Sequence, residues 1–208
     1  MAIKPILFST EMVRAILDGR KTCTRRLVRF LPGENSQWTG YIRDGLMLYN
    51  GRNEPCIMKA PYQPGDILYV RETWCGLPVN EAGHMRGHTI YYYKADGELR
   101  PKGWRGTWYP SIHMPKEAAR IWLKVTDVRV EKLQDITNDG AKAEGAIDNR
   151  VFIHSPENEY DRIHTAREHF VEIWDSTIKK SDLDRYGWGA NPWVWVIQFE
   201  RCEKPKEG

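Results

Sequence analysis

Long apolar runs are missing from this chain of 208 residues. The longest continuous apolar stretches are Trp193–Ile197 and Ile90–Tyr93, far below the roughly 20 residues that a membrane-spanning helix needs. After Pro5 the N-terminal segment has only Ile6–Phe8 in succession, which is too short for the core of a signal peptide. The sequence therefore predicts a cytoplasmic protein that has no membrane partner.

Cysteine is scarce and scattered. The four cysteines are Cys23, Cys56, Cys75 and Cys202. No two of them form a C-x-x-C pair, so neither a zinc ribbon nor a dithiol redox motif is indicated, and separate thiols suit a reducing compartment. His84 and His88 are four residues apart, but glycines at 83 and 87 disfavour a helix there, and we can name no third ligand. We therefore expect neither a metal nor a cofactor.

Excess charge of one sign is also lacking, because 31 basic residues face 28 acidic ones. A net charge of +3 does not by itself indicate a nucleic-acid-binding protein, but the distribution is uneven. Between Gly19 and Gly33 there is no acid, and the basic residues are Arg20, Lys21, Arg25, Arg26 and Arg29. Nine tryptophans and ten tyrosines exceed what a core of this size needs, so we expect some of them to line a pocket.

Hydrophobic periodicity in the first half predicts short elements. Ile3–Phe8 is a strand candidate, and Ser9 and Thr10 can cap a helix over Thr10–Asp18 that Gly19 ends. Segment 31–64 is punctuated by turn residues around pieces such as Leu46–Tyr49. Segment 75–115 is rich in glycine, and there we expect irregular structure with one strand over Thr89–Lys94.

The second half alternates helices and strands. Ile121–Val130 has the period of a strand, with a change of phase near Thr126 that indicates a bulge. Thr137 can cap a helix over Asp139–Glu144 that ends at Gly145, and Arg162–Ser176 is the longest helix expected. Many short strands with a few peripheral helices predict an α+β fold built on a small, partly closed β-barrel.

One run follows the first predicted helix directly: Gly-Arg-Lys-Thr-Cys-Thr-Arg-Arg, at Gly19–Arg26. It resembles the G-x-K-T-x-T-x-R hallmark of the ASCH domain family, whose fold is PUA-like. Four other stretches are similar to larger phage and prophage members of that family: Lys4–Phe8, Gly65–Trp74, Pro110–Pro115 and Asn191–Trp195. The resemblance implies a single domain over residues 1–202, with insertions around 31–64 and 75–115. The polar residues at 203–208 indicate a flexible tail.

The resemblance also implies chemistry. A small bacterial branch of the family hydrolyses N4-acetylcytidine with a lysine, a threonine and a glutamate, and Lys21 and Thr24 match the first two within the hallmark run. The glutamate belongs in a leucine-x-x-x-threonine context, which Leu133 and Thr137 supply here, so Glu144 is the matching carboxylate. The resemblance thus names Lys21, Thr24 and Glu144 as catalytic residues. The insertions make this chain much longer than the small hydrolases, so its substrate can differ from theirs.

These three residue types can cleave an amide. A threonine hydroxyl becomes a nucleophile when a base takes its proton, and a lysine can be that base if burial or nearby positive charge lowers its pKa. Glu144 can orient the lysine or protonate the leaving amine. Lys21 and Thr24 are three residues apart, so the hypothesis requires irregular backbone between them. The competing interpretation is a solvated basic loop.

Five other side chains are candidates for substrate binding. Arg25 and Arg26 offer planar forks suited to phosphate or base edges, or else ordinary surface charge. Glu72 and Trp74 follow a predicted strand and can bind and stack a base, or else pair with an arginine and fill the core. His113 lies between prolines and can be an acid or base near neutral pH, or a structural donor.

These observations leave three functions open. The first is an amidohydrolase acting on N4-acylated cytosine or cytidine, with a modified nucleoside or RNA as its partner. The second is a non-catalytic RNA-binding module of phage or prophage origin, whose affinity would fall steeply with salt. The third is a ribonuclease that uses the same cations to stabilise a phosphoryl transition state. The oligomeric state is not predicted.

Overall fold

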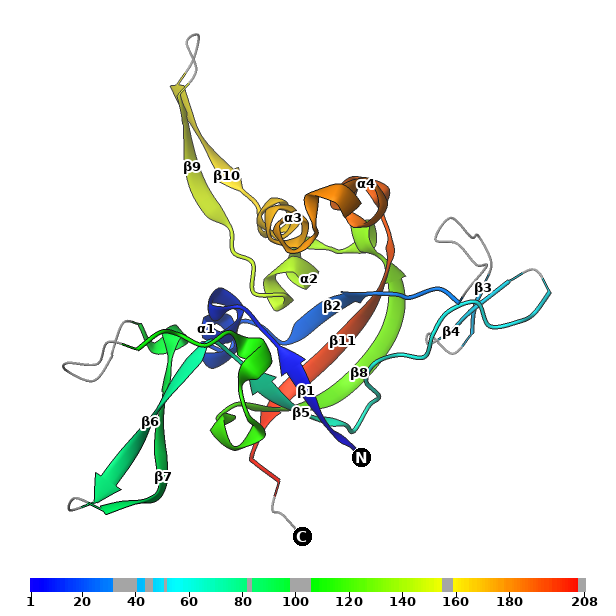
Figure 1. Cartoon of the computed structure of the whole chain (residues 1–208). Helices are drawn as coiled ribbons and strands as arrows, with labels where there is room; N and C mark the ends of the chain where they lie inside the picture. The colour runs from blue at the N-terminus through cyan, green and yellow to red at the C-terminus, as the bar shows by residue number, and fades with distance from the viewer. Residues whose placement is uncertain are drawn as a thin grey trace. The chain divides into compact units, whose positions relative to one another are not determined.

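The computed structural model describes residues 1–31, 41–43, 47–50, 52–81, 84–97, 106–154 and 159–205 (Figure 1). Their contacts group the chain into two compact units. Unit 1 is Met1–Gly19, Gly65–Lys124 and Glu200–Gly208, and unit 2 is Arg20–Pro64 and Val125–Phe199. Within the described ranges, no helix combines the length and the apolar character needed to cross a bilayer.

The main sheet has five hydrogen-bonded strands. In order they are β1 (Ile3–Leu7), β5 (Ile67–Arg71), β8 (Trp122–Lys132), β11 (Trp193–Cys202) and β2 (Cys23–Leu27). β1 and β5 are parallel, whereas β5 pairs with β8, and β11 with β2, in antiparallel register. The mixed helix and strand composition expected from the sequence is confirmed. Among the described strands, the order runs from one edge to the other and forms no closed barrel.

Unit 1 begins with the strand and helix that the sequence predicted. In α1 (Thr10–Leu17) the hydroxyl of Ser9 accepts a hydrogen bond from the backbone N–H of Met12, and the chain leaves the helix at Gly19 with a φ of 75°. The core of the unit includes Ile67, Met114 and Trp122. A helix capped at one end and stopped by glycine at the other needs only local signals, which explains why the sequence located it.

The expectation of irregular structure is wrong for residues 75–81 and 84–88, which are strands, while the strand expected over Thr89–Lys94 is confirmed. β6 (Trp74–Glu81) and β7 (His84–Tyr93) form an antiparallel hairpin in which Gly76 lies opposite Tyr91. A Cβ atom at Gly76 would lie 2.9 Å from the side chain of Thr89 and 3.1 Å from the Trp74 ring. The glycine therefore makes room for these two side chains, whereas the glycine-rich sequence indicated irregular structure.

Unit 2 packs helices against the β2–β11 pair. The helices are α2 (Asn138–Ala143), α3 (Ala166–Thr177) and α4 (Leu183–Tyr186) (Figure 1). The buried cluster between them joins Cys23 of β2 to Ala141 of α2, Phe170 of α3 and Val196 of β11. The predicted cap at Thr137 is confirmed, because its hydroxyl accepts from the backbone N–H of Gly140. Gly145 follows the helix with a φ of 94°.

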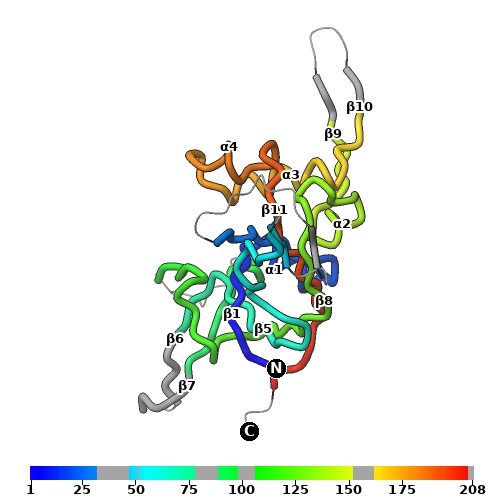
Figure 2. The backbone as a smooth tube through the Cα atoms, turned by 90° about the vertical axis from the view of Figure 1, so that its right-hand side faces the viewer, coloured from blue at the N-terminus to red at the C-terminus, as the bar shows by residue number. Residues whose placement is uncertain are grey.

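Two hairpins complete unit 2. β3 (Tyr41–Arg43) pairs with β4 (Met47–Tyr49), which confirms the strand expected near that position. β9 (Asn149–His154) pairs with β10 (Glu159–His164), and Figure 2 shows this hairpin extending away from α3. The predicted helix over Arg162–Ser176 starts four residues late, because residues 162–164 belong to β10 and Thr165 caps α3.

Strand β8 shows the predicted change of phase. Leu123 and Val125 are buried in its first part, whereas Val128 and Val130 are buried in its second part. The buried side chains thus change from odd-numbered to even-numbered positions near Thr126. The change turns Arg129 and Glu131 to the face on which the charged cluster of unit 2 is built.

Candidate active site

The hallmark run enters unit 2 through a loop tied to the end of α2. The backbone N–H of Thr22 donates to the carbonyl of Ala143, and the Thr22 carbonyl accepts from the N–H of Phe199. The guanidinium of Arg20 donates to the carbonyl of Gly145 at 3.1 Å. Because β2 starts only at Cys23, the residues before it are free of strand geometry, and Lys21 can turn toward the C-cap residue of α2. That C-cap residue is Glu144.

Lys21 and Glu144 form a buried ion pair. The ammonium lies 2.7 Å from a carboxylate oxygen of Glu144, and it donates two further bonds, to the carbonyls of Glu144 at 2.8 Å and Cys23 at 2.7 Å. The Lys21 side chain is 0% exposed and that of Glu144 is 5% exposed. An ammonium has three protons, and these three acceptors match them. The structure thus brings together two of the three residues that the resemblance named.

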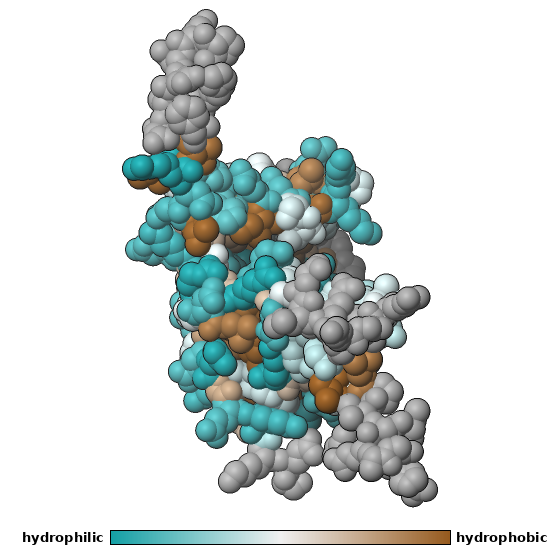
Figure 3. All heavy atoms as spheres, turned by 90° about the vertical axis from the view of Figure 1, so that its left-hand side faces the viewer, coloured by the Kyte–Doolittle hydropathy of each residue, from teal (hydrophilic) through white to brown (hydrophobic). Residues whose placement is uncertain are grey.

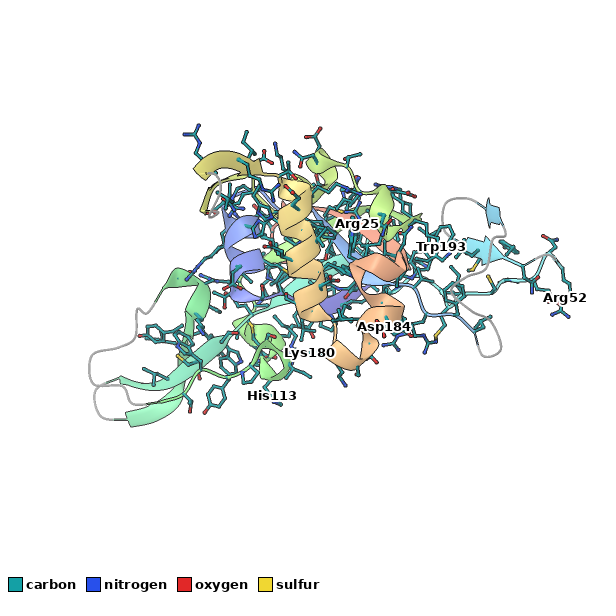
Figure 4. The ribbon with its side chains drawn as sticks, turned by 90° about the horizontal axis from the view of Figure 1, so that it is seen from above. Arg25, Arg52, His113, Lys180, Asp184 and Trp193 are labelled. Carbon is teal, nitrogen blue, oxygen red and sulfur yellow. The ribbon has the colours of Figure 1, made fainter. Side chains whose placement is uncertain are left out.

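Arg25 extends this ion pair on the same side of β2. Its guanidinium lies 3.3 Å from the second carboxylate oxygen of Glu144 and 3.4 Å from a carboxylate oxygen of Glu131. Its Cζ atom stands 5.9 Å from the centroid of the Phe170 ring, and its Nε is buried without a hydrogen-bond partner. Figure 4 shows Arg25 in the interior of the unit. This arginine is therefore part of a closed network and is not a surface contact for phosphate.

Thr24 and Arg26 occupy the opposite face of β2, because side chains alternate along a strand. A guanidinium nitrogen of Arg26, Nη1, donates to the hydroxyl oxygen of Thr24 at 2.8 Å and to the carbonyl of Arg25 at 3.0 Å. Thr24 is buried, and Arg26 is half-buried. Arg26 also interacts electrostatically with Tyr62, whose pKa burial raises and the arginine lowers. Thr24, the third residue named by the resemblance, thus accepts a hydrogen bond from the Arg26 guanidinium.

Burial and charge shift the acidity of the groups around Lys21. Burial lowers the pKa of Lys21 from its ordinary value, and the charge of Arg26 adds to this, while Glu144 acts in the opposite direction. Burial raises the pKa of the Cys23 thiol to about 12, and the Glu144 charge contributes. The thiol is therefore protonated at neutral pH, and the hydroxyl of Thr24 is the remaining nucleophile of β2 within this cluster.

The cluster gains a surplus of positive charge when Lys21 takes up a proton. Three cations, Lys21, Arg25 and Arg26, then face two carboxylates, Glu144 and Glu131. In a site of low dielectric, such a surplus stabilises negative charge that develops on a reacting oxygen. The arrangement therefore suits the attack of a hydroxyl on a carbonyl carbon.

Glu72 lies in unit 1 and is paired with an arginine. Its carboxylate is 1% exposed and accepts from the Nε of Arg120 at 2.9 Å and from its Nη2 at 3.0 Å. Arg120 in turn donates to Asp96 and stacks over the Tyr93 ring at 3.9 Å. The pairing with an arginine, which the sequence left open, is the one that the structure shows, although the partner is Arg120.

Trp74 and His113 also belong to unit 1. Trp74 packs partly buried against the core of that unit, with its ring centroid 5.7 Å from that of Tyr91 and 5.4 Å from that of Tyr109. The core position, again one of the two alternatives, therefore describes it. His113 is exposed in a 3₁₀ turn over Ser111–His113 (Figure 4).

Three contributors to the cluster escaped sequence reasoning. The carboxylate of Glu131 pairs with Arg25 and lies 2.5 Å from Arg129. Its alternation with the buried Val130 along β8 could have indicated that Glu131 lies on the other face of the strand. Gly140 leaves space inside α2, since a Cβ atom there would lie 3.6 Å from a terminal nitrogen of Arg25. Tyr62 comes from the segment between β4 and β5, and nothing in its sequence context marked it.

In the described part of the chain, no three His, Cys, Asp or Glu side chains lie close enough together to form a metal-ligand set.

The face of the molecule in Figure 3 is mostly hydrophilic, with apolar side chains in separate areas. Comparison with protein-family models, with curated proteins and with solved structures gives no match for this chain.

Proposed function

We propose that this chain is a PUA-like protein of the ASCH type and hydrolyses the amide of an N4-acylated cytosine or cytidine. The observation that carries the proposal is the buried Lys21–Glu144 pair, which lies next to the start of β2, the strand that also presents Thr24 to Arg26. Lys21 and Thr24 are three residues apart, Glu144 comes from the end of α2, and Lys21 contacts Glu144 directly before β2 begins. A solvated basic loop would leave these side chains exposed, and they are buried.

In the proposed reaction the Thr24 oxygen attacks the acyl carbon while its proton passes to the neutral amine of Lys21. The bond from the acyl carbon to cytosine N4 then breaks, and Lys21 returns the proton to the leaving nitrogen. Water cleaves the acyl-threonine ester and releases the carboxylate. Burial supports this role for Lys21, because it disfavours the charged ammonium, and Glu144 orients the amine through two of its oxygens.

The test is the release of acetate and cytidine from N4-acetylcytidine. Thr24→Val keeps the shape of the side chain and removes the hydroxyl, so we expect it to lower the rate by about a thousandfold or more. Thr24→Ser retains the hydroxyl and is expected to keep part of the activity. Arg52→Gln is the matched control, because the Arg52 side chain is 82% exposed at the periphery of the same unit (Figure 4). Equal rates for the wild type and Thr24→Val would contradict the proposal.

Two exposed arginines at either end of the basic segment, Arg20 and Arg29, favour a second candidate, an RNA-binding module without turnover. Such a module would bind RNA with an affinity that falls steeply as salt rises, because phosphate contacts release counterions. Salt-independent binding, or no binding, would exclude it. Mass analysis of the incubated RNA distinguishes deacylation from cleavage, and cleavage products would point to the ribonuclease.

A further inference from the structure

We infer that Arg26 is a positioning residue for Thr24, holding its hydroxyl oxygen and stabilising the negative charge that forms on that oxygen as it loses its proton. The inference rests on the proposed function because it takes Thr24 as the nucleophile. It begins from one contact, in which the guanidinium nitrogen Nη1 of Arg26 donates to the Thr24 oxygen at 2.8 Å. A hydrogen bond from a charged donor is stronger than one from a neutral donor, and it strengthens further as the acceptor becomes an anion.

The geometry of this contact leaves the oxygen able to react. A hydroxyl oxygen has two lone pairs and one proton. Arg26 occupies one lone pair, which leaves the other for attack and the proton for a base. The same nitrogen also donates to the carbonyl of Arg25 at 3.0 Å, so the fork is fixed to the strand that carries its target.

Arg26 has a second effect, on the base. The charged and titratable groups that act on Lys21 are Glu144, which follows α2, and Arg26 and Cys23 of β2. Arg25 reaches the same carboxylate from the other side. Glu144 and Cys23 raise the pKa of Lys21, whereas Arg26 lowers it. The arginine therefore favours the neutral amine that accepts the proton of Thr24.

The sequence suggested a different role for Arg26, a contact to phosphate or to a base edge. Its hydrogen bonds to Thr24 and to the backbone use the guanidinium inside the protein. The neighbouring arginine cannot substitute for it, because Arg25 points to the opposite face of β2 and is held by Glu144 and Glu131. One strand thus carries two adjacent arginines with different tasks.

The experiment measures the reactivity of Thr24 directly, with p-nitrophenyl acetate as the probe. The Thr24 oxygen forms a bond to the acetyl carbon, the bond to the nitrophenyl oxygen breaks, p-nitrophenolate leaves with the electron pair, and Lys21 takes the hydroxyl proton. Intact mass and peptide mapping locate the acetyl group. The rate of labelling at Thr24 is followed from pH 5 to pH 10 in the full chain.

We expect Arg26→Gln to slow acetylation of Thr24 by about tenfold to a hundredfold, the range of a hydrogen bond to a charged group. The pH at which labelling rises should also move upward, because loss of the Arg26 charge raises the pKa of Lys21. Arg26→Lys keeps the charge, so it should hold the pH profile near that of the wild type and recover part of the rate. A merely structural role would not move the profile. Arg52→Gln serves as the surface control.

Two results would overturn the inference: labelling of Arg26→Gln at the wild-type rate with an unchanged pH profile, or wild-type protein that shows neither acetylation of Thr24 nor Thr24-dependent release of p-nitrophenolate. If Arg26→Gln does not fold, Arg26→Lys decides, since a profile shifted as far as loss of the charge predicts would contradict the electrostatic role. Hydrolysis of N4-acetylcytidine is measured on the same preparation. Acetylation of Thr24 without hydrolysis would support the role of Arg26 and contradict the proposed substrate.

Discussion

The ammonium of Lys21 holds Glu144 twice, at its carboxylate and at its own backbone carbonyl. The carbonyl bond fixes the position of the α2 end, and the carboxylate bond fixes the rotamer of the side chain. The pair therefore links the hallmark run to the end of α2, and it is also a candidate catalytic dyad. Activity and stability should depend on the same two residues, and the first prediction concerns stability.

Lys21→Met should destabilise the protein by about 3–5 kcal/mol, because it removes one partner of a buried ion pair. Urea unfolding measures the change. The double variant Lys21→Met/Glu144→Gln should lose less than the sum of the two single variants, since its members no longer leave each other unpaired. Lys180→Met changes an exposed lysine of the same unit and should stay within about 0.5 kcal/mol of the wild type. A loss of similar size at both lysines would contradict the buried pair.

The capping box of α3 should give the stability a pH dependence at low pH. The carboxylate of Glu168 accepts from the backbone and hydroxyl of Thr165 and from Arg162, and these bonds lower its pKa to about 2. A lowered pKa means that the contribution is present above the ordinary value of 4.5 and is lost as pH falls toward 2. Thermal unfolding of Glu168→Gln should therefore approach that of the wild type across this window.

Glu172 is the control for that experiment. It lies in the same helix, and its side chain is 67% exposed, so its ion pair with His164 at 3.4 Å contributes little to stability. Glu172→Gln should follow the wild-type pH profile, and a Glu168→Gln variant that does the same would refute the capping box as its source.

Two nearby glycines should respond differently to alanine. A Cβ atom at Gly187 would lie 2.6 Å from the carbonyl oxygen of Leu183 and 3.3 Å from a carboxylate oxygen of Asp175, whereas one at Gly189 would meet nothing within 4 Å. Gly187→Ala should cost about 1–3 kcal/mol, because a backbone atom cannot move aside as a flexible side chain does. Gly189→Ala should be nearly neutral. Chemical denaturation of both variants tests the difference, and equal effects would rule out the steric cause.

The cysteines should label in two classes. Cys23, Cys56 and Cys75 are buried, and Cys202 is half-buried. Only thiolates react readily, and the pKa of Cys23 stands at about 12. Under native conditions at pH 8, iodoacetamide should therefore modify Cys202 first, and all four cysteines should react after denaturation. Early labelling of Cys23, found by peptide mapping, would contradict the buried cluster around Lys21.

The sequence located those elements whose signals are local. The caps at Ser9 and Thr137 and the stops at Gly19 and Gly145 each act within a few residues, and each was found where predicted. Of the β6–β7 hairpin, only the strand over Thr89–Lys94 was expected, because the rest of the segment is rich in glycine. Gly76 is explained by its neighbours in the fold, since a Cβ atom there would lie 2.9 Å from Thr89 and 3.1 Å from Trp74. The contact with Thr89 depends on the pairing of two strands, which no local propensity records.

The candidate site also combines residues that the sequence could identify with contacts that only the fold determines. Lys21, Thr24 and Glu144 could be named because the chain resembles a motif, and the tie from Thr22 to Ala143 that gathers two of them is a backbone contact invisible in the sequence. For Glu72 the sequence left open whether it binds a base or pairs with an arginine, because its partner, Arg120, lies 48 residues away. Pairing at that distance depends on β5 lying beside β8, which only the fold determines.

Alternation along β2 makes the register of one short strand decisive. Cys23 and Arg25 face the helices of unit 2, and Thr24 and Arg26 face away from them. A single residue inserted between Gly19 and Cys23 could be absorbed in the loop, but one inserted inside the strand would exchange the two faces beyond it. Arginine and threonine would trade surroundings, and the ion pairs and the hydroxyl contact would vanish in one step. Tolerance to insertion should therefore fall abruptly at the point where the loop becomes strand.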